Sequence, residues 1–212
     1  MSGMKPTTSR RERAKADKMR RILAAAAKLF SKNGFSGTTV QQIADEADVA
    51  VGTLFLYVSD KSELLLLLHH QEVETAFMKA ARRLAVRENL IPSLKRFLSD
   101  LLRPYEKNLE LSKVVVTEYL FHRGRVKQKL DDLTAAILQV VRERILAAQD
   151  TGEVDRSVDV EVAVFHIHAI YHSTLAFFLA DCLPGAASPK DTLAALLQSL
   201  WQGMRPCTAE RD

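Results

Sequence analysis

The chain has 212 residues, of which 47% are hydrophobic and 26% are charged, and its formal net charge is +4. This composition excludes an intrinsically disordered chain, and the length suffices for one or two domains with a substantial core. The polar, basic N-terminus lacks the apolar segment of a secretory signal, and no run approaches the roughly twenty apolar residues that span a bilayer. The two cysteines, Cys182 and Cys207, have neither metal-binding nor disulfide spacing. We therefore expect a soluble cytoplasmic protein that has no membrane partner, no metal and no cofactor.

Positive charge is concentrated in a basic arm at the N-terminus, residues 1–21. This segment contains eight Lys or Arg residues and two acidic residues, a net charge of +6, whereas the whole chain carries +4. A concentrated basic arm is typical of a phosphate-binding extension when it adjoins a helix-turn-helix, which the elements predicted below indicate. The alternative is a solubilising tail that makes no specific contact.

The first predicted helix begins between Ala14 and Asp17 and ends at Lys32. Its apolar residues recur at helical spacing, and Gly34 suits the left-handed conformation that ends a helix. The apolar stripe consists of Ile22, Leu23, Ala26, Leu29 and Phe30.

Two short helices joined by a tight turn are predicted next. Thr39 and Gln42 have the spacing of a capping box at the start of the first helix. Asp48 falls in the turn, where an Asp tolerates a left-handed conformation. The second helix covers residues 51–58. Two helices around so short a turn are typical of a helix-turn-helix.

A second capping box, Asp60 with Glu63, opens a long helix predicted for residues 61–87, which contains five consecutive leucines. Over this stretch and the helices before it, the sequence resembles the tetracycline-repressor (TetR) family of transcriptional regulators. The resemblance implies a DNA-binding domain of residues 1–60 and a ligand-binding and dimerisation domain of residues 61–212. The matching residues are Phe35, Thr38, Thr39, Val40, Ile43, Ala44, Ala47, Val49, Gly52, Thr53, Leu54, Phe55, Tyr57, Lys61 and Leu64.

The sequence departs from the family pattern at three positions. Asp48 replaces the usual turn glycine, Ala50 replaces the Ser or Thr that caps the recognition helix, and Val58 replaces a common aromatic residue. Ala is a poor N-cap and costs about 1 kcal/mol relative to Ser. We therefore expect a recognition helix that DNA binding helps to order.

Beyond residue 87 the apolar spacing predicts five further helices and no strand, so the chain is expected to be all-α with about nine helices. Pro104 lies inside an apolar pattern, so the helix that contains it is expected to be kinked or to end there. The five helices cover about residues 92–104, 109–121, 126–149, 158–181 and 189–204.

The last two predicted helices are too apolar for a free surface, and the first of them is apolar nearly all round. The resemblance implies that they pair with the same helices of a second copy, and the homodimer places two recognition helices on a palindromic operator. The alternative is a monomeric bundle with residues 158–181 at its centre. The expected interface residues are Ala163, Ile167, Ile170, Tyr171, Thr174, Phe178, Leu193, Leu197, Leu200 and Trp201.

The resemblance also implies that residues 51–58 enter the major groove of double-stranded DNA, while neighbouring residues touch phosphates. No Arg or Lys lies in this helix, so bidentate guanine contacts from it are excluded, and we expect reliance on the DNA backbone and the basic arm. The expected DNA-binding residues are Thr39, Gln41, Gln42, Val51, Gly52, Thr53, Phe55, Leu56, Tyr57 and Lys61.

Polar and aromatic residues interrupt the apolar stretches of the C-terminal helices and predict a small-molecule pocket. A mostly apolar pocket with a few polar groups is typical of such sites. The alternative is that these groups satisfy one another in a closed core. The expected ligand-binding residues are Phe97, Leu101, Tyr105, Glu118, Tyr119, His122, Phe165, His168, His172 and Phe177.

The rival hypothesis is a metal-binding or enzymatic helical bundle that uses His168 and His172, which lie one helical turn apart. No His-Glu-x-x-His signature, phosphate-binding loop or glycine-rich dinucleotide motif accompanies them. We therefore predict a repressor that a small hydrophobic ligand releases from DNA, and no enzyme.

Overall fold

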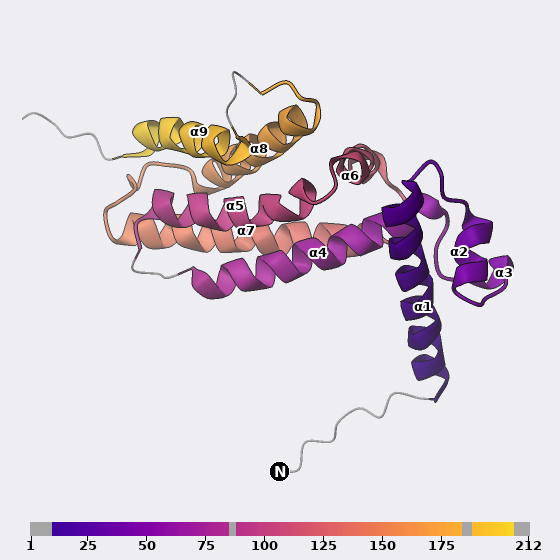
Figure 1. Ribbon diagram of the computed structural model, residues 1–212. Coiled ribbons are helices and arrows are strands. Elements are labelled where there is room, and N and C mark those ends of the chain that lie inside the picture. The colour runs from indigo at the N-terminus through magenta and orange to yellow at the C-terminus, as the bar shows by residue number, and fades with distance from the viewer. Residues whose placement is uncertain (1–9, 85–87, 184–187, 206–212) are drawn as a thin grey trace, which may run out of the picture.

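The computed structural model describes residues 10–84, 88–183 and 188–205, and within them every regular element is a helix (Figure 1). The predicted all-α fold is confirmed for this part of the chain. The helices are α1 (Arg10–Asn33), α2 (Val40–Glu46), α3 (Val51–Leu54), α4 (Lys61–Arg83), α5 (Leu90–Glu106), α6 (Leu109–Phe121), α7 (Lys127–Asp150), α8 (Val160–Leu179) and α9 (Pro189–Met204).

The helices form a bundle with a smaller helical unit at one end (Figure 1). Helices α4, α5 and α7 run alongside one another, α8 and α9 lie on one side of them, and α1 to α3 gather at the N-terminal end of α4. Helix α4 therefore contributes to both parts of the molecule.

The N-terminal unit is built around a hydrophobic cluster in which α1 faces α2 and α3. Ile22 and Phe30 of α1 are buried against Ile43 of α2 and Leu54 of α3. The cluster continues across the predicted domain boundary at residue 60, because it also contains four leucines of α4 and residues of α6 and α7. The division at residue 60 remains a prediction.

A second hydrophobic cluster fills the bundle. It joins α4, α5, α7, α8 and α9, and its most deeply buried side chains include Leu90, Leu94, Ile145, Leu193 and Leu197. These residues recur at helical spacing along amphipathic helices, which explains why the sequence located the helices well.

Some predicted helix boundaries differ from those of the structure. Helix α1 begins at Arg10, earlier than predicted, and α5 continues past Pro104 to Glu106. Helix α3 ends at Leu54 instead of Val58, and a turn occupies the remainder. The first residues of the basic arm, 1–9, lie outside the described residues.

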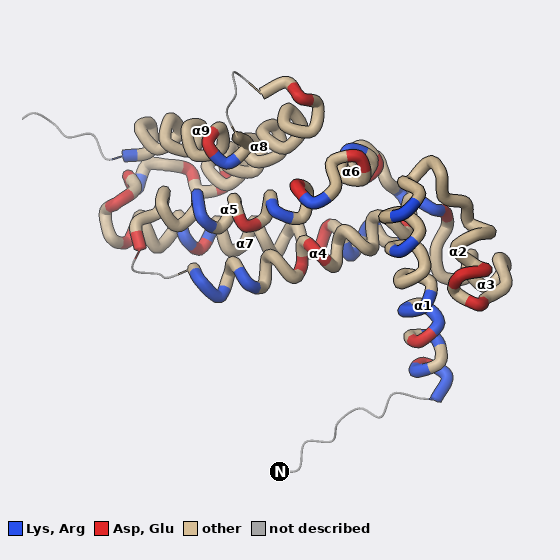
Figure 2. Tube along the Cα trace, viewed as in Figure 1, with Lys and Arg blue, Asp and Glu red and all other residues tan. Residues whose placement is uncertain are grey.

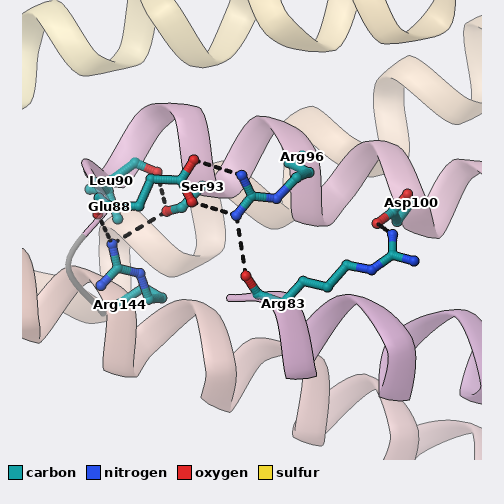
Figure 3. A network of polar contacts seen from close by, with 7 residues as sticks. All are labelled: Arg83, Glu88, Leu90, Ser93, Arg96, Asp100 and Arg144. Atoms are coloured by element: carbon teal, nitrogen blue, oxygen red, sulfur yellow. Dashed lines mark hydrogen bonds and ion pairs between the residues drawn. The ribbon is translucent and has the colours of Figure 1, made fainter. Parts of the chain in front are cut away.

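A polar network joins α4, α5 and α7 at the end remote from α1 to α3 (Figure 3). The buried Arg144 donates to the Glu88 carbonyl oxygen at 2.6 Å and to Ser93 Oγ at 3.3 Å. Arg96 pairs with the Glu88 carboxylate and donates to the Arg83 carbonyl oxygen at 3.3 Å. These bonds fix the remote ends of three helices that line the cavity described below.

Candidate DNA-binding and effector sites

The start of α2 is held by the predicted capping box. The Gln42 backbone N–H donates to Thr39 Oγ1 at 3.2 Å, and the Thr39 N–H donates to Gln42 Oε1 at 2.8 Å. Gln41 is also engaged, because its Nε2 donates to Asp45 Oδ1 at 2.8 Å. Each glutamine side chain therefore uses one end of its amide inside the chain, Gln42 through Oε1 and Gln41 through Nε2, and the other end is left to contact a base.

The turn between α2 and α3 adopts the predicted left-handed conformation. Asp48 has φ +52°, and Arg21 of α1 lies 3.3 Å from its carboxylate. Ala50 is the N-cap of α3, and its side chain makes no capping bond. The start of α3 therefore lacks a capping hydrogen bond, as the sequence predicts.

The exposed surface of α3 and of the turn after it is uncharged and partly apolar. Phe55 is 43% exposed and Leu56 is 72% exposed in the turn after α3, and Gly52 faces open space. Val51, Thr53 and Tyr57 are half-buried. This surface can approach sugars and thymine methyl groups, and positive charge comes from the N-terminal half of α1 instead (Figure 2).

Lys61 has a structural role that the sequence did not predict. Its Nζ donates to the carbonyl oxygens of Phe35 at 2.7 Å and Thr38 at 2.8 Å, and it lies 4.2 Å from the centroid of the Phe35 ring. Two of the three ammonium donors are therefore used inside the chain, and one remains for the predicted phosphate contact.

A cavity of about 340 Å³ lies among α4, α5, α6, α7 and α8. Leu, Val and Ile side chains make up most of its wall, and none of its lining residues is Asp, Glu, Lys or Arg. Five of the ten residues predicted to bind a ligand line it: Leu101, Tyr105, Tyr119, His168 and His172.

The other five lie outside the cavity wall. Phe97 is packed in the core edge-on to Phe77, Glu118 is half-buried, and His122 points to Glu63. Phe165 and Phe177 are 68% and 55% exposed, so they cannot form the wall that we expected. The sequence shows the apolar positions of α8 but does not show which of them face inward.

The polar groups of the cavity form a chain of ring contacts. Tyr119 donates to Thr134 Oγ1 at 2.8 Å, because the single proton of Thr134 is donated to the Leu130 carbonyl oxygen at 3.0 Å. His172 stacks on Tyr119 with ring centroids 6.4 Å apart, and it contacts His168 edge-on at 4.3 Å. Burial lowers the pKa of both histidines, and that of His172 falls to about 4, so both are neutral at pH 7.

Glu63 is a buried carboxylate between the cavity and the helix-turn-helix. Its side chain is fully buried and accepts from the Ser59 N–H at 2.6 Å, the Val126 N–H at 3.2 Å and His122 Nε2 at 3.2 Å. Burial raises the pKa of Glu63, but these hydrogen bonds outweigh it and lower the pKa overall. The sequence identifies Glu63 only as a cap, because its partners on the α6–α7 loop are about sixty residues away.

The α6–α7 loop also contacts the helix-turn-helix directly. Arg125 donates through Nη1 to the Leu56 carbonyl oxygen at 2.9 Å. Gly124 makes the close approach possible, since a Cβ at this position would lie 2.0 Å from Glu63 Oε1 and 2.4 Å from His122 Nε2. The loop therefore links α6, which lines the cavity, to the turn that ends α3.

The predicted dimer residues lie mainly on the inner face of α8 and α9. Ala163, Ile167, Tyr171, Thr174, Leu193 and Leu197 are buried within the chain and cannot meet a partner in this conformation. Ile170, Phe178, Leu200 and Trp201 are half-buried. The outward face instead presents other large apolar side chains: Val162, Phe165, Phe177 and Leu196.

Helix α8 is long and apolar enough, by length and composition, to cross a membrane, with a mean hydropathy of 1.5 in its most apolar window. The expectation that no segment approaches this composition was therefore wrong. Buried core helices of soluble proteins pass the same test, and 39% of this window is buried inside the chain. The packing of α8 against α7 and α9 accounts for its inner face.

The metal hypothesis gains no support from the structure. His168 and His172 are neighbours, but no group of three or more His, Cys, Asp or Glu side chains that could hold a metal ion occurs in the described part of the chain. Two imidazoles alone are an incomplete ligand set for a transition metal.

Comparisons with known proteins concern the N-terminal helices and the chain as a whole. Residues 22–68 match the family model described as bacterial regulatory proteins, tetR family. The chain is 30% identical over 205 residues to the HTH-type transcriptional repressor NicS of Pseudomonas putida, which covers 90% of this chain and 94% of that repressor. It is 27% identical to the HTH-type transcriptional repressor KstR of Mycobacterium tuberculosis over 124 residues, which span 58% of this chain and 56% of KstR.

A similar solved structure is that of Thermus thermophilus FadR, a TetR-family transcriptional repressor in complex with lauroyl-CoA. The two chains superpose with a TM-score of 0.72 over 92% of this chain and 98% of FadR, at 22% sequence identity. At this identity the likeness concerns the fold.

Proposed function

Because the chain belongs to the tetR family of bacterial regulatory proteins, we propose that it is a transcriptional repressor that leaves its operator when a small hydrophobic molecule fills the cavity. The observation that carries the proposal is the position of α4. This helix begins in the hydrophobic cluster of the helix-turn-helix and lines the apolar cavity one to three turns later. A protein with these features acts on DNA in the bacterial cytoplasm and needs no catalytic group.

The repressor binds DNA as a homodimer on a palindromic operator, with half-sites about one DNA turn apart. The outward faces of α8 and α9 support this arrangement, since Phe165 and Phe177 on α8 and Leu196 on α9 leave apolar area exposed. A twofold contact through this face covers both helices and places two copies of α3 on one side of the dimer.

Base contacts come from the surface of α3 and the following turn, and affinity comes from phosphates. Gly52, Phe55 and Leu56 are the exposed residues of this surface. The Lys and Arg residues in the N-terminal half of α1 belong to the basic arm predicted from the sequence, and they are exposed or half-buried (Figure 2). Such contacts make binding strongly dependent on salt.

Two connections transmit the state of the cavity to the helix-turn-helix. The first is α4 itself, and the second is the α6–α7 loop with its bonds from Arg125 to Leu56 and from His122 to Glu63. A ligand shifts the equilibrium only by its difference in affinity for the two conformations. Because the remote ends of α4, α5 and α7 are held by the Arg144 network, a ligand moves the near ends, where both connections lie.

The test is a gel-shift titration of the purified protein with the DNA upstream of its own coding region. We expect a specific shift that weakens steeply as salt increases. Removal of residues 1–13 should lower the affinity and reduce the slope of log affinity against log salt by about one for each phosphate that the shortened protein no longer neutralises. Equal retention of random DNA at every salt concentration would refute sequence-specific operator binding. An unchanged slope in the shortened protein would show that residues 1–13 do not contact phosphates.

A further inference from the structure

One imidazole in the cavity wall has a nitrogen without a partner. Nε2 of His69, on α4, is buried and forms no hydrogen bond with any described residue. The ring is held against Tyr105, with ring centroids 4.3 Å apart. An unpaired buried polar atom costs about 1–3 kcal/mol, so its position in a cavity wall indicates a partner that arrives with the ligand.

The remaining wall restricts the charge of that partner. No lining residue carries a carboxylate, an ammonium or a guanidinium group, and apolar side chains surround the polar ones. Burial, with smaller contributions from Lys107 and His70, lowers the pKa of His69 to about 4, so its ring is neutral at pH 7. An ionised group would lose its hydration here and gain no counter-charge.

A neutral imidazole suits an uncharged oxygen well. Each neutral ring has one nitrogen that donates and one that accepts, and either tautomer of His69 can present Nε2 in the role that the ligand requires. Tyr119 has already donated its proton to Thr134, so only its lone pairs face other groups. A ligand hydroxyl can donate to Tyr119 Oη or to Nε2 of His69, and it can accept from Nε2 when that nitrogen carries the proton. A ligand carbonyl can only accept, so it pairs with the tautomer of His69 in which Nε2 donates.

We propose that the part of the effector inside the cavity is an uncharged apolar body with one hydroxyl or carbonyl oxygen, and that this oxygen bonds to Nε2 of His69. The proposal rests on the proposed function for its biological meaning, but the binding it describes is independent of DNA. It excludes carboxylates and ammonium groups from the cavity, and it makes His69 the residue that selects for oxygen.

The direct test uses probes with one apolar tail and different head groups. Octan-1-ol, octanoate, octylammonium and octane are titrated into the full-length protein at about pH 8, where the carboxylate and the amine are ionised. Binding is measured by displacement of the neutral dye Nile red. Octan-1-ol is expected to bind at least about tenfold more tightly than each of the other three.

Variants of His69 show whether this nitrogen causes the preference. His69→Phe keeps a ring beside Tyr105 but removes the hydrogen bond, so the preference for octan-1-ol over octane should disappear. His69→Gln keeps a polar side chain and should restore part of it. Because the readout is a ratio of two affinities in one protein, a general loss of stability does not imitate the result.

Three outcomes would overturn the proposal: tighter binding of either charged probe, no binding of octan-1-ol, or an unchanged alcohol preference in His69→Phe. Binding of octanoyl-CoA without binding of octan-1-ol would also overturn it, because the affinity would then lie outside the cavity. A gel shift on the same protein sample reports the repressor function separately. Failure to bind DNA with intact selection for the alcohol would refute the proposed function alone.

Discussion

At the scale of single residues, two side chains connect the helix-turn-helix to the cavity-lining helices: the buried carboxylate of Glu63, which accepts hydrogen bonds, and Arg125 of the α6–α7 loop, which donates one. Glu63 accepts bonds from both sides of the junction, and Arg125 reaches the last turn of the helix-turn-helix. A carboxylate held by several donors in a buried site has few alternative positions. Glu63 therefore holds the start of α4 against the α6–α7 loop. Arg125 is exposed, so its hydrogen bond to Leu56 is the contact that we expect to change when the cavity is filled.

Arg125→Ala is expected to weaken the coupling between effector and operator with little effect on stability. The hydrogen bond that it removes is partly exposed, and residues along such a connection typically change coupling by about 0.5–2 kcal/mol. The measurement is operator affinity by fluorescence anisotropy with and without a saturating ligand. The ratio of the two affinities should fall by about two- to thirtyfold.

Arg123→Ala is the matched control, since Arg123 is an exposed arginine of the same loop and donates no hydrogen bond to the helix-turn-helix among the described residues. If both variants keep the wild-type ratio, the loop does not transmit the signal and α4 acts alone.

The buried histidines make stability depend on pH. His69 and His172 each have a pKa of about 4 in the folded chain, compared with an ordinary value of 6.5. Between these values the unfolded chain binds more protons, so the free energy of unfolding falls as the pH is lowered from about 6.5 towards 4. Each imidazole contributes a slope of up to about 1.4 kcal/mol per pH unit.

Urea unfolding of His172→Phe at several pH values in this window measures the contribution. The slope of the unfolding free energy against pH should be shallower than in the wild type. His166→Phe removes an exposed histidine from the same helix and serves as the control. An equal change of slope in both variants would contradict the assignment to the buried ring.

At the scale of elements, α3 is the weakest helix of the described chain. It covers four residues, its N-cap is Ala50 without a side-chain bond, and only Leu54 of the helix is buried. Helices this short gain little from their own hydrogen bonds and depend on packing or on a partner. DNA is the partner that the proposed function supplies.

Ala50→Ser is expected to stabilise the protein by about 1 kcal/mol, because Ala50 already has the extended backbone, φ −67° and ψ 144°, that a capping Ser adopts. Operator affinity should rise as well, because α3 would already be more ordered before it binds DNA. The unfolding free energy in urea and the gel shift measure the two effects. Ala24→Ser, on the exposed face of α1, controls for a hydroxyl placed without a cap, and equal stabilisation by both would rule out capping.

At the scale of the whole molecule, the outward face of α8 and α9 is the surface that the proposed homodimer uses. Phe165 of this face is 68% exposed, which is costly for a free surface and ordinary for a subunit interface. The half-buried Trp201 on α9 adds a residue type that is enriched in interfaces. The proposed homodimer would cover this face.

Phe165→Glu should convert the dimer to a monomer, because two carboxylates would meet across a twofold contact. Sedimentation velocity measures the change of mass, and operator affinity should drop by about a hundredfold or more once the two recognition helices are no longer linked. Phe121→Glu is the control, since Phe121 is 81% exposed on α6, outside this face. A Phe165→Glu variant that sediments like the wild type would place the interface elsewhere.

The sequence by itself determined the features that depend on neighbours within a few residues. The capping box of Thr39 and Gln42, the left-handed Asp48 and the uncapped Ala50 are all local, so spacing and residue type suffice to find them. The helical periods and the TetR resemblance follow from the same local order.

Only the tertiary structure decided which partners meet across long stretches of chain. Glu63 and His122 lie fifty-nine residues apart, and the apolar residues of α8 surround the helix, so no local pattern tells which face the chain covers. Packing turned Ala163 and Tyr171 inward and left Phe165 and Phe177 outside, and it enclosed His69 with an unpaired nitrogen. The physical reason is that periodicity fixes the side of a helix on which residues fall, whereas contacts with other helices fix where that side points.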